Sequence, residues 1–142
     1  MAKKLDSAHS IEQLQRYLRQ NGPSKAGAIC DALTISQPSL SRLLNAMGGE
    51  ILKIGQARSA QYALKKQIGE TENPIPIFEI DAKGKASHAA DLVSLFPKGF
   101  VLKRNSKAAK ESIFSDLPYF LDDLRPAGFL GRLIPKQQPE LA

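Results

Sequence analysis

The sequence predicts an α+β protein, in which three short helices and a hairpin precede a small domain of mixed strands and helices. Two observations lead to this prediction. Apolar residues recur at helical spacing in three consecutive segments of the first half, and two short apolar runs around a turn come next. Charge divides the 142-residue chain in the same place, because residues 1–66 hold ten Lys and Arg against four Asp and Glu, whereas residues 67–142 hold ten against ten. The whole net charge of +6 therefore lies in the first half.

The first two helices are predicted from their caps and their apolar faces. Ser10 and Gln13 have the spacing of a capping box, so the first helix is expected to begin at Ser10. Asn21-Gly22-Pro23 ends it, and Ser24 is expected to cap the second helix. The apolar positions are Ile11, Leu14 and Leu18 in the first helix and Ala26, Ile29, Cys30 and Leu33 in the second.

The third helix has the most regular pattern in the chain. Ser36 is its predicted N-cap, Pro38 is tolerated in the first turn, and Gly48-Gly49 ends it. Its apolar ladder is Leu40, Leu43, Leu44 and Met47.

A hairpin is predicted directly after the third helix. The runs "EILKIG" and "AQYALKK" lie on either side of the turn-sized stretch "QARS". Three helices with a tight connection between the second and third, followed by a hairpin, are typical of a winged helix-turn-helix. We therefore predict this domain at residues 8–66.

The second half is predicted to be a separate small domain. Residues 67–76, "QIGETENPIP", are polar with two prolines and are expected to form a linker. Strands are predicted in "IPIFEIDA" and "GFVLKRN", with a turn at "KGK" and no assignment for the residues between. Ser115 is expected to cap a helix in "SDLPYFLDDL", and Pro126 to start another. The predicted domain covers residues 77–135.

The polar front of the third helix predicts contact with DNA. A recognition helix places its N-terminal residues nearest the base edges of the major groove, where Gln and Asn pair with adenine and Arg with guanine or phosphate. The hairpin turn would contact the backbone or the adjacent minor groove. The candidate DNA-binding residues are Ser36, Gln37, Ser39, Ser41, Arg42, Asn45, Gln56 and Arg58. Lys25 and Lys53 are further candidates for phosphate contacts.

A plainer interpretation of the same residues stays open. The serines of the third helix can be caps and solvated surface on a packing helix, and Arg58 can be an exposed turn arginine. The basic first half can likewise be a solvated surface without a polyanion partner.

Two stretches resemble known families. "SQPSLSRLLNAMG" is similar to the recognition helices of many bacterial winged-helix regulators. "DLPYFLDDLRPAGFLGR" (116–132) resembles "LPWFLxDMRPQGFLGR" in the YjjJ-type branch of HipA-like serine/threonine kinases, where a winged helix precedes the kinase N-subdomain. The order of the two halves matches, so the resemblance covers most of the chain. It implies a partner-docking face formed by Tyr119, Phe120, Phe129 and Arg132, although Phe120 and Phe129 also lie on apolar stripes and can be core residues.

Several classes of protein are excluded by what the sequence lacks. One cysteine and two histidines leave no disulfide framework and too few ligands for structural zinc, so no metal is expected. No apolar run approaches the roughly 18 residues that span a bilayer, which predicts a cytoplasmic protein without a membrane partner. The phosphotransfer motifs "GxxxxGK[ST]", "HRD" and "DFG" are missing. We therefore expect a protein that is not an enzyme and has no cofactor.

The sequence therefore predicts a DNA-binding transcriptional regulator or an antitoxin-like component of a HipA-type toxin–antitoxin system. Its expected partners are double-stranded DNA, a HipA-like kinase core and, because one winged helix reads few base pairs, a second copy in a homodimer. The alternative is a non-catalytic N-terminal regulatory fragment of a HipA-like serine/threonine kinase. A third possibility is a structural adaptor, which would show no salt-dependent binding to DNA.

Overall fold

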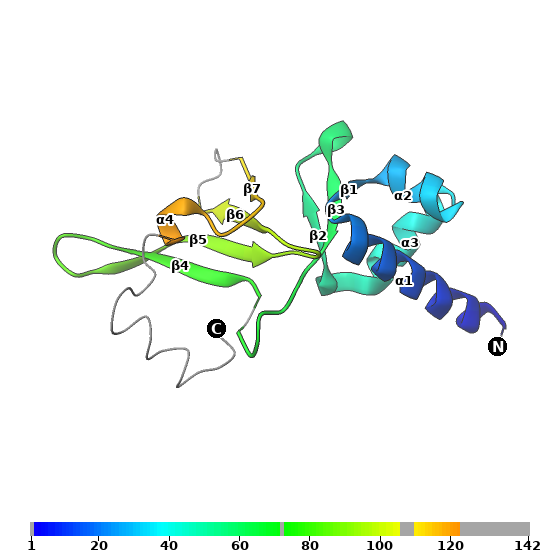
Figure 1. Ribbon diagram of the computed structural model, residues 1–142, viewed down its shortest axis with the longest axis horizontal. Coiled ribbons are helices and arrows are strands. Elements are labelled where there is room, and N and C mark those ends of the chain that lie inside the picture. The colour runs from blue at the N-terminus through cyan, green and yellow to red at the C-terminus, as the bar shows by residue number, and fades with distance from the viewer. Residues whose placement is uncertain (1, 72, 106–109, 123–142) are drawn as a thin grey trace.

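The computed structural model describes residues 2–71, 73–105 and 110–122. Helices gather at the N-terminal end, and a four-stranded sheet with a long projecting hairpin forms the other end (Figure 1). Two antiparallel sheets are present, with strand orders β1-β3-β2 and β4-β5-β6-β7. The predicted α+β class is confirmed. The helices are α1 (Ala2–Asn21), α2 (Ala26–Leu33), α3 (Gln37–Met47) and α4 (Tyr119–Asp122). The strands are β1 (Ser24–Lys25), β2 (Ile51–Ile54), β3 (Gln61–Leu64), β4 (Ile75–Ile80), β5 (Ala86–Ser94), β6 (Phe100–Arg104) and β7 (Ser112–Phe114).

The first three helices bury the apolar faces that the sequence predicts. Each helix contributes at least one residue that is almost inaccessible to solvent, and Leu64 of β3 completes the cluster. The buried residues of this helical core are Leu14, Leu18, Ile29, Leu40, Met47 and Leu64. Because 3.6 residues make one helical turn, the i, i+3 and i+4 spacing was sufficient to identify these faces.

Two predicted helix caps in the first half are wrong. α1 begins at Ala2, so Ser10 lies inside the helix; the preceding Ala, Lys and Leu residues are strong helix formers, and they extend it beyond the predicted cap. Ser24 belongs to β1, where it pairs with Tyr62 of β3, and the N-cap of α2 is Lys25. The Ser24 hydroxyl donates instead to the Gly22 carbonyl oxygen at 3.0 Å.

The predicted hairpin is confirmed, and we call it the 51–64 hairpin. β2 and β3 pair antiparallel, with Ile51 opposite Leu64 and Leu52 opposite Ala63, and a short 3₁₀ turn, Ala57–Ser59, forms its tip. Directly opposed residues share a face of the sheet, so the first pair faces the helical core and the second faces away from it.

The second sheet contains more strands than the sequence predicted. β4 and β6 correspond to the predicted strands, and β4 begins at Ile75, inside the segment predicted as a linker. β5 occupies the unassigned residues, and β7 was not predicted. α4 begins at Tyr119 rather than after the predicted cap Ser115, because Pro118 opens its single turn by accepting a hydrogen bond from the Leu121 N–H at 2.8 Å. The helix predicted from Pro126 lies outside the described residues.

A shared apolar cluster joins the two halves. Backbone hydrogen bonds cross the same joint, from the Phe96 N–H to the Leu64 oxygen at 3.0 Å and from the Lys66 N–H to the Ser94 oxygen at 2.9 Å. The outward face of the 51–64 hairpin therefore packs on the second sheet. The residues of this joint core are Leu52, Ile54 and Ala63 from the hairpin and Val93, Leu95 and Val101 from β5, the following turn and β6. The predicted division into domains at 67–76 stays a prediction.

Gly99 closes the turn between β5 and β6 at a position where a side chain does not fit. Its φ is +106°, and a Cβ would lie 2.6 Å from the Phe114 carbonyl oxygen. We expect Gly99→Ala to lower the free energy of unfolding by about 1–3 kcal/mol, measured by urea denaturation. Gly27→Ala is the matched control, because Gly27 is helical and its Cβ would meet nothing within 4 Å; this change should raise stability by about 0.5–1 kcal/mol. Equal effects would contradict the close approach.

Candidate nucleic-acid interface

α3 begins with the cap that the sequence predicts. Ser36 has extended backbone angles, φ −77° and ψ 157°, and its hydroxyl oxygen accepts a hydrogen bond from the Ser39 N–H at 3.3 Å. The two hydroxyl oxygens lie 2.9 Å apart. Both serines therefore hold the first turn of α3, and Ser39 is half-buried.

The face of α3 opposite its apolar ladder is exposed to solvent. Gln37, Ser41, Arg42 and Asn45 are exposed, whereas Leu40 and Met47 on the other side are buried. The exposed face carries one cation and no carboxylate. It can therefore approach a polyanion without repulsion from its own side chains.

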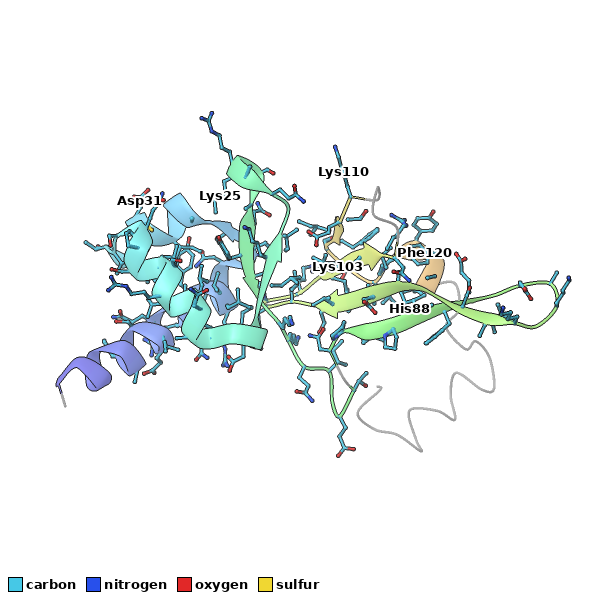
Figure 2. All side chains as sticks on the ribbon, turned by 180° about the vertical axis from the view of Figure 1, so that it is seen from behind. Lys25, Asp31, His88, Lys103, Lys110 and Phe120 are labelled. Carbon is cyan, nitrogen blue, oxygen red and sulfur yellow. The ribbon has the colours of Figure 1, made fainter. Side chains whose placement is uncertain are left out.

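A groove of about 630 Å³ connects α3 to the 51–64 hairpin. It brings Gln37 of α3 together with Arg58 of the hairpin, two candidates that lie in different elements. Lys25, the N-cap residue of α2, lines the groove as well, and Figure 2 shows it next to the hairpin. The remaining lining residues are Ala26, Gly27, Ala28, Asp31, Ala57, Ala60 and Tyr62.

The electrostatics of this groove suit an anion. Lys25 and Arg58 supply two cations against the single carboxylate of Asp31. The first turn of α2 also borders the groove; it has no side-chain cap and no acidic residue, and the first amide groups of a helix have no partner within the helix. The groove therefore has the charge and the N–H donors to hold a phosphate.

The other predicted DNA-binding residues lie around the groove without lining it. Ser41, Arg42 and Asn45 extend along α3, and Gln56 is exposed just before the hairpin tip. Sequence reasoning did not place Asp31 or Tyr62 at the site. Tyr62 lies in an apolar strand run, and no local signal distinguishes it from a core residue.

The residues predicted to bind a protein partner lie on the other half. Tyr119 is 77% exposed and meets the Phe120 ring edge-on, with ring centres 5.5 Å apart. Phe120 itself packs on the second sheet, against the buried residues Ala90, Leu92 and Leu102. Phe129 and Arg132 lie outside the described residues. Of the two candidates that the structure describes, Tyr119 is more exposed than Phe120.

The described residues contain little that could hold a metal. No three histidine, cysteine, aspartate or glutamate side chains gather in this part of the chain. His88 Nε2 lies 2.8 Å from Asp91 Oδ1, as an exposed pair on β5. Across residues 2–71, 73–105 and 110–122, no helix has the length and hydropathy of a membrane span.

Removing the cap of α3 tests whether Ser36 holds the front of this helix. We expect Ser36→Ala to lower the free energy of unfolding by about 1 kcal/mol, because the Ser39 N–H loses its acceptor. Thermal denaturation followed by circular dichroism measures the change. Ser41→Ala, at an exposed position inside the same helix, should leave stability unchanged or slightly raised. A loss of the same size in both variants would show that the cap contributes nothing.

Comparisons with known proteins place the chain in a family. Residues 71–142 match the family model described as YjjJ-like toxin, middle domain. The chain is 39% identical over 111 residues to Toxin YjjJ of Escherichia coli (strain K12), an alignment that covers 78% of this chain and 24% of that protein. It thus spans about a quarter of the length of this relative. No solved structure matches the chain significantly. The chain belongs to the YjjJ-like toxin family.

Proposed function

We propose that this chain binds double-stranded DNA through α3 and the 51–64 hairpin, as a winged helix-turn-helix does, and acts as a regulator or antitoxin-like component in a HipA-type toxin–antitoxin system. The toxin–antitoxin setting rests on the family to which the chain belongs. DNA binding rests on the geometry of the N-terminal half.

The observation that carries the proposal is the groove that Gln37 and Arg58 share. With the exposed face of α3 in a major groove, Gln37, Arg42 and Asn45 would meet base edges. Arg58 would then meet the neighbouring phosphate backbone, because the groove joins the start of α3 to the hairpin tip. Lys25 adds a second cation at the same position.

The distribution of charge supports the same proposal. Residues 1–66 carry the entire surplus of six positive charges. A positive surface next to an uncapped helix start attracts phosphates through Coulomb forces and releases counterions from the duplex. Such binding weakens steeply as salt rises, which gives a direct test.

The experiment titrates the purified chain against a duplex from its own upstream region and an unrelated duplex of equal length, each at two salt concentrations. We expect tighter binding to the upstream duplex and a steep decrease of affinity with salt for both. Weak binding that is equal on the two duplexes would contradict a regulator and leave only a basic surface.

A second candidate function is a non-catalytic regulatory part of a HipA-like kinase, acting in cis or in trans. Tyr119 favours it, because an exposed tyrosine above an apolar sheet face is typical of a protein interface. A groove of about 370 Å³ lies beside Tyr119. Phe78, Leu102 and five further residues of the sheet line it, together with Phe120 and Leu121 of α4.

Co-purification tests this second function. If the chain co-purifies with a kinase core encoded next to the gene, and Tyr119→Ala abolishes the co-purification, the result would support it. Co-purification that Tyr119→Ala leaves intact would contradict it.

A further inference from the structure

One carboxylate links the second sheet to the turn end of the 51–64 hairpin. The Gly55 N–H donates a hydrogen bond to Glu111 Oε2 at 2.8 Å. The other oxygen, Oε1, lies 3.3 Å from Lys103 Nζ of β6. Gly55 follows β2 directly, and Glu111 directly precedes β7. The edge of the second sheet therefore lies beside the part of the hairpin that leads to Arg58.

This contact places the cation of Lys110 next to the hairpin. Lys110 is exposed, and Figure 2 shows it on the same side of the molecule as the hairpin tip. Among the described residues it makes no ion pair. The neighbouring Glu111 does not cancel its charge, because that carboxylate is already bound to Lys103 and to the Gly55 N–H.

We infer that Lys110 binds a DNA phosphate beside the hairpin, so that the duplex interface continues from the N-terminal helices onto the second sheet. This inference rests on the proposed function. The groove with Lys25 and Arg58 borders the hairpin, and Lys110 directly precedes Glu111, which contacts the turn end of the same hairpin at Gly55. A hairpin that contacts a duplex groove has a phosphate strand on each side, so cations on both sides fit this arrangement.

The contact is expected to be independent of base sequence. An ammonium group on a flexible stem acts as a point charge, and phosphates are the same at every base pair. Each phosphate that a protein neutralises adds about 0.9 to the slope of log K against log salt for duplex DNA. One lysine therefore has a measurable signature that differs from that of a base contact.

The test compares Lys110→Ala with Lys83→Ala. Lys83 is an exposed lysine in the turn between β4 and β5, at the tip of the projecting hairpin away from the helices (Figure 1). Both variants remove one positive charge, so they lower the net charge equally. Affinity for the upstream and the unrelated duplex is measured over a series of salt concentrations. We expect Lys110→Ala to lower the salt slope by about 0.9 and to weaken binding to both duplexes by the same factor. Lys83→Ala should leave slope and affinity unchanged.

The outcomes separate this inference from the proposed function. If the unaltered chain binds both duplexes weakly and equally, the proposed function fails and the inference fails with it. If the unaltered chain binds its upstream duplex and Arg58→Ala lowers the slope, but Lys110→Ala keeps it, only the inference is overturned. Equal effects of Lys110→Ala and Lys83→Ala would also overturn it, because net charge alone would then explain the result.

Discussion

Leu95→Ala is expected to lower the free energy of unfolding by about 2–5 kcal/mol, the largest change of stability that we predict. Leu95 is 1% exposed and follows β5, where it packs with Leu52, Ile54 and Ala63 of the 51–64 hairpin and with Val93 and Val101 of the second sheet. Truncation leaves a cavity that neither sheet can fill, because each is fixed by its own hydrogen bonds and by the backbone bonds across the joint.

The same variant tests whether the two halves unfold together. Urea denaturation is followed by circular dichroism and by tyrosine fluorescence, since the chain has no tryptophan and has tyrosines in both halves. A single transition shifted to lower urea is expected, because both sheets lose the same contact. Ile80→Ala is the control; Ile80 is 73% exposed on β4, so stability should change by less than about 0.5 kcal/mol. Two separate transitions, with the helical half unaffected, would show that the joint core does not couple the halves.

The N-terminal half could be predicted because its signals are local. α3 has a serine cap, a proline in the first turn and an apolar ladder, and all three lie within twelve residues of the chain. The 51–64 hairpin follows from two apolar runs around a polar turn. In both cases, the residues that define the element are neighbours in sequence, so no tertiary contact is needed to identify them.

The missed strands lack such local signals. The start of β5, "ASH", consists of small and polar residues that are exposed in the structure, and only pairing with β4 makes it part of a strand. β7 has three residues and pairs with β6 alone. Ser24 was misassigned for a similar reason, because its pairing with Tyr62 joins residues that are far apart in sequence.

The apolar pattern of the hairpin already indicated the joint core. Leu52 and Ala63 face the second sheet, whereas Ile51 and Leu64 face the helices, so the hairpin is apolar on both sides. A hairpin with one solvated face would alternate apolar and polar residues, and "ILKI" and "YAL" do not. The polar composition of residues 67–76 nevertheless favoured a linker between separate domains. Composition shows that this segment is a connection, but it does not show that the strands on either side of it pack together.

The candidate site could be predicted in part. The residue types on α3 and at the hairpin tip follow from the sequence, but the groove that brings Gln37 and Arg58 together depends on how α2, α3 and the hairpin pack. The role inferred for Lys110 has no signal in the sequence, since this lysine lies in the half whose charges balance and its position beside the hairpin depends on tertiary contacts such as the Glu111–Gly55 bond.

Arg42→Ala with Arg58→Ala is expected to weaken binding to the upstream duplex by about 2–4 kcal/mol, if a base contact of about 1–3 kcal/mol and a phosphate contact add. Arg42 lies on the exposed face of α3 and Arg58 lines the groove at the hairpin tip, so each would meet a different part of the duplex. Both side chains are exposed, and the free energy of unfolding should stay within about 0.5 kcal/mol of the unaltered chain. Fluorescence anisotropy at fixed salt measures the affinity.

The single variants separate the two roles. Arg42→Ala should reduce the preference for the upstream over the unrelated duplex, because a base contact depends on sequence. Arg58→Ala should weaken binding to both duplexes by the same factor, because a phosphate contact does not depend on sequence. It should also lower the slope of log K against log salt by about 0.9. Arg16→Ala is the control: Arg16 is an exposed residue of α1 paired with Glu12 at 3.5 Å, and its loss should change neither quantity. If Arg42→Ala weakened binding to both duplexes equally, Arg42 would contact a phosphate, and Gln37 and Asn45 would remain as the base-reading candidates of α3.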